Sequence, residues 1–359
     1  MKSTKRKRAA RNRKKILALV AGVLVLFLLS FLVVMLVKKL KPEPIEGAGE
    51  ALSRSEIEAS ERIRQSILDE AKLNKEVNYN GHNYKYNENI DVLLIMGLDD
   101  RDLIDYTQLS GKNEQACADL ILLAVFDKEK KTYSLLQINR DTMADVMMYD
   151  VFDTFMGLYK RQICLSHIYR TKHEDACEDT KFAVSHLLYD VEISNYFALT
   201  MDSISIINDS VGGVTVTIED DFSQIDPNLV QGQTITLHGD QAETYVRSRG
   251  GIVNSPTNIN RMNRQRTYMS ALLVLLGQKT SESNSFAFDL FDKLSPYMVT
   301  DCSHDQLSNY ISQFSDYTLD KIVTPEGTAE VGEDNLMEFK VDSASLRGIV
   351  IDLFYVRQD

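Results

Sequence analysis

Two patterns of apolar and polar positions recur along this chain of 359 residues. Short, almost continuous apolar runs predict buried strands at residues 91–100, 118–127, 132–138 and 212–218, with another near 319–324. Longer segments with apolar residues three or four positions apart predict helices at residues 178–190, 202–210, 240–246, 258–276, 304–314 and 342–353. Strands and helices mixed over about 275 residues predict one α/β domain, in which helices cover both faces of a mixed sheet as three α-β-α layers.

The longest apolar run lies near the N-terminus. Residues 16–37 contain no charged side chain over 22 positions. As a helix with a rise of about 1.5 Å per residue, this run spans about 33 Å, enough to cross the core of a bilayer. We therefore expect a transmembrane helix at residues 16–38. The alternative is a cleaved signal peptide, whose apolar region is only about 7–15 residues long.

Charge asymmetry predicts how the chain is oriented. Residues 1–15 carry nine Lys/Arg and no acidic residue, whereas three lysines follow the apolar run. By the positive-inside rule, the basic tail lies in the cytoplasm and a single pass through the cell membrane places the remainder outside. Residues 39–83 contain two prolines and many Glu, Lys and Arg residues, which predicts an extracytoplasmic stalk with a solvated helix. The folded domain is then expected at residues 84–359.

One arginine cluster interrupts an otherwise acidic chain. The formal charge is −12, yet no Asp or Glu lies between Glu243 and Glu282. Five arginines occur in this interval: Arg247, Arg249, Arg261, Arg264 and Arg266. Because a guanidinium group is always charged and binds phosphate oxygens in pairs, the cluster predicts a site for a polyanion.

The helix predicted at residues 258–276 presents polar and apolar faces side by side. Asn258, Arg261 and Gln265 share one face. The adjoining face is apolar and contains Met262, Met269, Leu272, Leu273 and Leu276. Hydrogen-bond donors beside an apolar surface suit a lipid with a phosphate head group. Arg264 and Arg266 are expected to point away, toward solvent.

Charged residues also follow the predicted strands. Asp99, Asp100, Arg101 and Asp102 follow the first strand, and Arg140 and Asp141 follow the third. Ligands of open α/β sheets bind beyond the carboxyl ends of strands. If the second strand runs antiparallel to the first, Asp119 at its start lies beside Asp99, and two such carboxylates are typical ligands of Mg²⁺ in phosphate chemistry. The alternative is that each Asp only caps a turn.

Taken in order, these motifs resemble the LytR-CpsA-Psr family. The family motifs G-x-D-x-R, S-D-T and I-P-R-D are matched by residues 97–101, 118–120 and 138–141. Its G-G-V-x-V, L-x-G-x-x-A-x-x-Y-V-R-x-R and D-x-x-R-x-x-R-Q segments are matched by residues 212–216, 237–249 and 258–265. The resemblance covers roughly residues 88–280. The chain departs from the family pattern at Ala118, Leu120, Asn139 and Asn258, and the family's N-A-A-Y-x-x-G-G stretch is poorly kept around residues 166–169.

The resemblance implies a membrane-anchored, Mg²⁺-dependent phosphotransferase of the LytR-CpsA-Psr fold. Such an enzyme moves a glycopolymer, such as teichoic acid or capsule, with one phosphate from a polyprenyl pyrophosphate to a hydroxyl of peptidoglycan during cell wall biogenesis. It implies that Asp99 and Asp119 bind Mg²⁺ and that Asp99, Asp119 and Arg140 are catalytic. The residues expected to bind the pyrophosphate are Arg101, Arg140, Arg247, Arg249, Asn258, Arg261 and Gln265.

Other functions fit parts of the sequence. The departures at Asn258 and at residues 118–120 suit a non-catalytic scaffold or envelope regulator that binds polyprenyl pyrophosphate. A basic tail suits nucleic-acid binding. Beside a membrane, however, topology and contact with anionic lipid explain the tail more simply, so no nucleic-acid partner is expected.

The cysteines leave two interpretations open. Cys117, Cys164, Cys177 and Cys302 all lie on the predicted outer side, where disulfides form. Four cysteines allow three pairings, and buried thiols are the alternative.

Overall fold

The computed structural model describes residues 54–101, 103, 116–248, 258–283, 285–333 and 335–359. Within these residues, no helix is both long and apolar enough to cross a bilayer. The predicted tail at residues 1–15 and the predicted transmembrane helix at residues 16–38 lie outside the described residues, as do Asp102 and Arg249.

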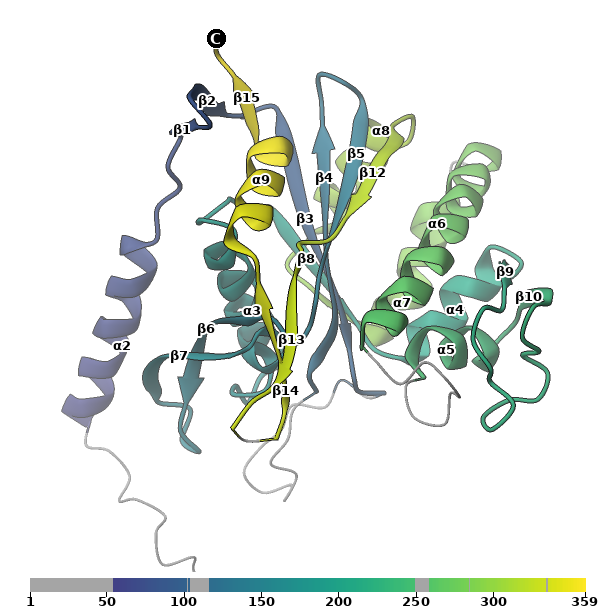
Figure 1. Ribbon diagram of the computed structural model, residues 1–359, viewed down its shortest axis with the longest axis horizontal. Coiled ribbons are helices and arrows are strands. Elements are labelled where there is room, and N and C mark those ends of the chain that lie inside the picture. The colour runs from purple at the N-terminus through teal and green to yellow at the C-terminus, as the bar shows by residue number, and fades with distance from the viewer. Residues whose placement is uncertain (1–53, 102, 104–115, 249–257, 284, 334) are drawn as a thin grey trace, which may run out of the picture. The chain divides into compact units, whose positions relative to one another are not determined.

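A six-stranded sheet forms the centre of the domain, in the order β11-β8-β3-β4-β5-β12. Figure 1 labels β3, β4, β5, β8 and β12 of this sheet. Its strands are β3 (Ile90–Leu98), β4 (Ala118–Asp127), β5 (Thr132–Ile138), β8 (Asn195–Leu199), β11 (Met298–Thr300) and β12 (Thr318–Val323). β4 is antiparallel to both β3 and β5, whereas β8 is parallel to β3 and β12 is parallel to β5. The prediction of a mixed sheet is therefore confirmed.

Helices cover both faces of this sheet (Figure 1). On one face lie α3 (His173–Leu187) and α9 (Ser343–Phe354), where Leu123 of β4 shares a core with Val184 and Val350. On the other lies α6 (Asn258–Glu282), where Leu122 shares a core with Met269. Leu122 and Leu123 enter different cores because successive side chains of a strand point to opposite faces. The predicted three-layer arrangement is present.

Smaller elements surround the three layers. Three two-stranded sheets pair β6 (Met143–Tyr149) with β7 (Phe155–Gln162), β9 (Val214–Thr217) with β10 (Thr234–Leu237), and β13 (Gly327–Val331) with β14 (Met337–Val341). Further helices among the described residues include α4 (Asp202–Ser210), α5 (Asp240–Arg247), α7 (Phe286–Leu294), α8 (His304–Phe314) and the short 3-10 helices η1 (Ile163–His167) and η2 (Ser295–Tyr297).

The residues expected to form the end of a stalk belong to the folded unit, which runs from Ser53 to Asp359. Residues 54–70 form the helix α2 (Arg54–Glu70), which has no buried residue, as expected of a solvated helix. It nevertheless contacts the domain, because Arg64 donates to the Tyr149 hydroxyl at 2.8 Å and pairs with the buried carboxylate of Asp179 at 3.3 Å. β1 (Glu76–Tyr79) and β2 (His82–Tyr86) form a sheet with the C-terminal strand β15 (Tyr355–Arg357). The boundary predicted at residue 84 therefore falls inside the unit.

Candidate functional site

The antiparallel pairing of β3 and β4 brings Asp99 and Asp119 to one edge of the sheet. The last residue of β3, Leu98, lies opposite Ala118, the first residue of β4. Beyond this pair, the Asp99 amide donates to the Cys117 carbonyl at 2.9 Å. Gly97 permits the close approach, since a Cβ atom there would lie 3.0 Å from the Cβ atom of Leu120. The antiparallel arrangement on which the convergence of Asp99 and Asp119 depends is therefore present.

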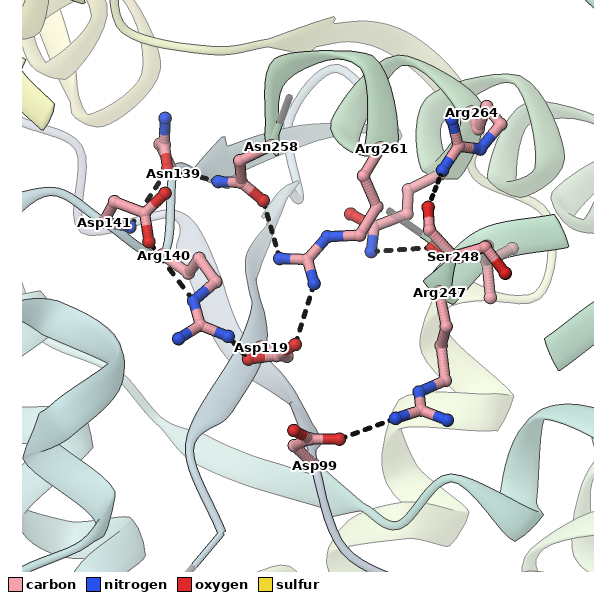
Figure 2. A network of polar contacts seen from close by, with 12 residues as sticks. Asp99, Asp119, Asn139, Arg140, Asp141, Arg247, Ser248, Asn258, Arg261 and Arg264 are labelled. Carbon is pink, nitrogen blue, oxygen red and sulfur yellow. Dashed lines mark hydrogen bonds and ion pairs between the residues drawn. The ribbon is translucent and has the colours of Figure 1, made fainter. Parts of the chain in front are cut away.

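Asp119 lies between two arginines from different parts of the chain (Figure 2). Its Oδ2 atom accepts a hydrogen bond from Arg261 in the first turn of α6 at 2.8 Å, and its Oδ1 atom contacts Arg140, which follows β5. The side chain of Arg261 is only 3 % exposed, while those of Arg140 and Asp119 are 15 % and 19 % exposed. These three charges are therefore screened by solvent much less than a surface pair would be.

A row of two amides continues from Arg261 away from Asp119. Arg261 donates to Oδ1 of Asn258 at 2.6 Å, and Nδ2 of Asn258 donates to Oδ1 of Asn139 at 2.7 Å (Figure 2). The same Asn139 oxygen accepts from the Asp141 amide at 3.0 Å. Asn139 and Asn258, which both depart from the family pattern, are thus hydrogen-bonded to each other.

A second, more exposed cluster surrounds Asp99. Arg247 at the end of α5 donates to Asp99 at 2.7 Å and to Glu243 at 2.8 Å. Glu243 also accepts from Arg101 at 2.7 Å, and Arg101 contacts Asp202 at the start of α4. The side chains of Asp99, Arg247 and Arg101 are 40 %, 38 % and 54 % exposed. Solvent therefore reaches this cluster, unlike the row around Arg261.

Glu243 and Asp202 were not predicted as site residues. Only 8 % of the Glu243 side chain is exposed, and it holds both Arg101 and Arg247. Its position four residues before Arg247 on a helix is the signal that could have identified the pair. Asp202 meets Arg101 from another element, for which the sequence offers no comparable signal.

Two predictions about α6 need correction. Arg264 does not face solvent, since its residue is 2 % exposed and its guanidinium group donates to the Tyr245 carbonyl at 2.9 Å and contacts Asp220 and the Ser248 carbonyl. Arg264 is therefore a structural residue that fixes the end of α5 to α6. Met262, expected on the apolar face beside Met269, is buried on another side of the helix.

A cavity of about 310 Å³ opens beside these charges. Its walls come from β3, β4, α4, α6 and α7, and they include Ile95, Leu122, Ile207, Met269, Leu272, Leu273, Leu276 and Leu290. Asp99, Asp119, Arg247, Arg261 and Gln265 also line it. Gln265 accepts from Gln137 of β5 at 3.0 Å, an unpredicted partner. The cavity thus combines an apolar interior with a cluster of arginines and carboxylates.

All four cysteines are thiols. Cys164 in η1 and Cys117 before β4 are hydrogen-bonded to each other, and this contact and burial raise the pKa of Cys164 well above its usual value. The Cys164 amide donates to the Arg140 carbonyl at 3.1 Å, which ties η1 to the site. Of the disulfide and thiol interpretations, the structure has the thiol form.

The described residues contain no group of three or more His, Cys, Asp or Glu side chains that would hold a metal by themselves. Asp99 and Asp119 do form a pair of carboxylates on one cavity. Mg²⁺ is commonly held by one or two carboxylates together with substrate phosphates and water, so the donor set fits a metal that binds with a phosphorylated substrate.

Comparisons with known proteins agree on one family. The chain is 24 % identical over 262 residues to the polyisoprenyl-teichoic acid–peptidoglycan teichoic acid transferase TagU of Bacillus licheniformis, covering 73 % of this chain and 76 % of the relative. It is 25 % identical over 265 residues to TagU of Enterococcus faecalis, covering 73 % and 78 %.

Solved structures share the fold. TagV of B. subtilis aligns with a TM-score of 0.55 at 21 % identity over 74 % of this chain and 96 % of the other. TagT bound to LIIa-WTA aligns with a TM-score of 0.55 at 18 % identity, over 74 % and 90 %. A profile of the LytR_cpsA_psr family matches residues 53–350, nearly the whole folded unit, and the chain therefore belongs to the LytR_cpsA_psr family.

Proposed function

We propose that this protein is a phosphotransferase that moves a glycopolymer, together with one phosphate, from a polyprenyl pyrophosphate to a hydroxyl of peptidoglycan. The observation that carries the proposal is the apolar cavity with Arg247, Arg261, Asp99 and Asp119 at one side. A polyprenyl chain requires an apolar enclosure, and its pyrophosphate requires cationic donors at the end of that enclosure. Family membership and the names of the curated relatives support the same activity, with a teichoic acid as the favoured polymer.

The charges of the site support a role for Mg²⁺. Four arginines belong to its ion-pair clusters, namely Arg101, Arg140, Arg247 and Arg261. Five carboxylates belong to the same clusters, namely Asp99, Asp119, Asp141, Asp202 and Glu243. A pyrophosphate that displaced these carboxylates from the arginines would leave them uncompensated. A divalent cation held by Asp99 and Asp119 would neutralise these two carboxylates and would supply charge stabilisation during phosphoryl transfer.

The arginines would then hold the substrate phosphates. Arg261 and Arg140 are oriented by Asp119, and Arg247 by Glu243, so their guanidinium groups are held in place before substrate binds. Phosphoryl transfer depends mainly on such positioning and charge stabilisation. The acceptor hydroxyl oxygen forms a bond to the phosphorus that bears the glycan, and the bridging bond to polyprenyl phosphate breaks.

The hydroxyl proton needs a carboxylate within reach. Among the described residues, Asp119 contacts two guanidinium groups and Asp99 contacts one, and both carboxylates line the cavity. Either carboxylate can receive the proton once the pyrophosphate has bound its arginine partners, because its oxygens are then available to the entering hydroxyl.

We further propose that a helix at residues 16–38 anchors the protein in the cell membrane with residues 1–15 in the cytoplasm. The nine basic residues before the apolar run are the basis of this orientation. Protease digestion of intact and permeabilised cells would test it, because a domain outside the membrane is cleaved in intact protoplasts. Protection of the domain in intact protoplasts would contradict the orientation.

A reconstituted assay tests the activity. Full-length protein in detergent, a polyprenyl pyrophosphate glycan and peptidoglycan should yield a phosphodiester product in the presence of Mg²⁺. Arg140→Ala should reduce this product strongly, while Arg347→Ala, a change at an exposed arginine of α9, should not.

A non-catalytic lipid-binding scaffold is the second candidate, favoured by the neutral Asn258 beside Arg261. Binding of the donor without any Mg²⁺-dependent product would identify the scaffold.

A further inference from the structure

A second hollow lies on a different side of α6 from the apolar cavity. It has a volume of about 360 Å³ and is lined by residues that include Asn139, Met262, Asn263, Arg266, Glu326 and Phe339. The first turns of α6 thus separate two hollows, because Arg261 and Gln265 line the apolar cavity while Met262 and Arg266 line the second hollow. Consecutive residues of a helix lie about 100° apart around its axis, so neighbours in the sequence face different hollows.

A continuous row of hydrogen bonds joins the two hollows. Asn139 lines the second hollow and accepts from Asn258, Asn258 accepts from Arg261, and Arg261 donates to Asp119 in the apolar cavity. In Figure 2, Asn139 and Asn258 lie on one side of Arg261 and Asp119, while Arg247 and Asp99 lie on the other. A ligand in the second hollow would therefore lie at the Asn139 end of this row, and the apolar cavity lies at its Asp119 end.

The wall of the second hollow is closely packed. A Cβ atom at Gly327 would lie 2.6 Å from the Phe339 ring and 2.5 Å from the Lys340 carbonyl oxygen, so the β13 backbone packs directly on β14. The Phe339 amide donates to the Asp141 carbonyl at 2.8 Å, which ties β14 to the segment that follows Arg140. Phe339 is 6 % exposed, so packing within the protein covers most of its ring. A preformed hollow lowers the entropic cost of binding.

The lining suits a sugar ring. Met262 and Phe339 provide an apolar surface, while Asn263, Arg266 and Glu326 provide donors and acceptors at its rim. A pyranose has one apolar face and a rim of hydroxyl and amide groups, which this combination of side chains matches. A free phosphate would not need the apolar surface.

We propose that this second hollow binds a pyranose of the peptidoglycan acceptor and presents its hydroxyl to the phosphate site. The inference rests on the proposed transfer reaction. In phosphoryl transfer the attacking and leaving oxygens are roughly in line. The leaving polyprenyl phosphate occupies the apolar cavity, so the attacking hydroxyl must enter from the opposite side of the arginine row, where the second hollow lies. The transferred glycan is attached to neither of these two oxygens and leaves by another direction.

Steady-state transfer by full-length Arg266→Ala, with Arg347→Ala as the matched control, tests the proposal. The acceptor is a soluble GlcNAc–MurNAc disaccharide, and KM is measured separately for acceptor and donor. Loss of a charged hydrogen bond should raise the acceptor KM about tenfold and leave the donor KM unchanged. Asn263→Ala should act in the same direction. An increase in the donor KM alone would show that the hollow holds the donor glycan instead, and unchanged values for both would also overturn the proposal.

Binding of the disaccharide without donor separates this inference from the transfer reaction. Titration calorimetry with wild type and Arg266→Ala should show weaker binding in the variant by a similar factor. If wild type binds the disaccharide through Arg266 but forms no product, the transfer reaction fails and the sugar site stands. If wild type forms product while disaccharide binding is independent of Arg266, the sugar site fails and the transfer reaction stands.

Discussion

The side-chain amide of Asn258 donates a hydrogen bond to the side-chain oxygen of Asn139 at 2.7 Å. The neighbours of both residues fix this direction, since Asn139 Oδ1 also accepts from the Asp141 amide and Asn258 Oδ1 accepts from Arg261. Both positions depart from the pattern of the family that the sequence resembles. An aspartate at position 258 would have no proton to donate to Asn139, so the two departures are compatible with each other and form one local arrangement.

The first prediction concerns this pair. Asn258→Asp would place a carboxylate against the Asn139 oxygen and add a negative charge beside Arg261. We expect the affinity for a polyprenyl pyrophosphate donor to fall about tenfold at low ionic strength, because a like charge opposes the pyrophosphate. Direct donor titration measures this effect. Asn74→Asp adds the same charge at an exposed position that already serves as an acceptor, and it should have no effect. Equal affinity in wild type and Asn258→Asp would contradict the expectation.

A second prediction compares two arginines that differ in burial. Arg261 is 3 % exposed and holds Asp119, whereas Arg247 is 38 % exposed. Both alanine variants should lose transfer by about a hundredfold or more, as expected when a charge-stabilising donor is removed. Only Arg261→Ala should also lower the free energy of unfolding, by about 3 kcal/mol, because it removes a buried ion-pair partner. Urea unfolding and initial rates on the same preparations measure the two effects. Equal stability losses in both variants would show that the difference in burial has no energetic consequence.

Arg264 is expected to affect stability and not binding. Its guanidinium group is buried among the Tyr245 carbonyl, the Ser248 carbonyl and Asp220. Arg264→Ala should lower the free energy of unfolding by about 3–5 kcal/mol, since Asp220 and two carbonyls lose a charged donor. Donor affinity measured below the melting transition of the variant should stay within about twofold of wild type. A selective loss of donor affinity in a stably folded variant would place Arg264 in the binding site after all.

The cavity predicts a dependence on lipid length. Leu276 lies on α6 and lines the apolar cavity, which has a volume of about 310 Å³. Leu276→Trp should fill part of this space, so transfer from a long polyprenyl donor should fall while transfer from a short-chain donor is retained. The ratio of the two kcat/KM values measures the effect. A parallel loss for both donors would mean that the substitution disturbs the fold or the phosphate site and not the lipid position.

Buried His167 predicts a loss of stability in acid. Its Nδ1 atom hydrogen-bonds to the Ala116 carbonyl at 2.8 Å, and burial lowers the pKa of His167 to about 4. The unfolded chain, with a histidine pKa near about 6.5, binds more protons between these values, so stability falls as pH drops from about 6.5 to 4. The difference between the two pKa values corresponds to a loss of about 3 kcal/mol in the free energy of unfolding over this pH range.

Urea unfolding of wild type and His167→Gln over this pH range tests the assignment. Burial also raises the pKa of Asp179 to about 6, which acts in the opposite direction over an overlapping range. The contribution of His167 is therefore the difference between the two proteins, which should shrink as pH falls. A constant difference between pH 4 and 6.5 would show that His167 does not titrate abnormally.

Local patterns predicted much of the framework. The strands at residues 118–127 and 132–138 and the helices at residues 202–210 and 304–314 occur with the predicted bounds. Continuous apolar runs and helical spacing depend only on neighbouring residues, so they can be identified without tertiary contacts. The hairpin of β6 and β7 and the strand β8 were not predicted. β7 lacks the apolar pattern of a buried strand, since its exposed and buried positions follow no simple alternation.

Local patterns likewise predicted part of the site, and tertiary contacts decided the rest. The sequence by itself determined the family resemblance and the polar face of Asn258, Arg261 and Gln265. Only the tertiary structure decided that Arg264 is buried, that Glu243 holds two arginines and that Asn139 meets Asn258. The physical reason is that helical spacing determines which residues share a face, whereas the element that covers each face comes from a distant part of the chain. Asp220 and Arg264 are 44 positions apart, and no local pattern connects them.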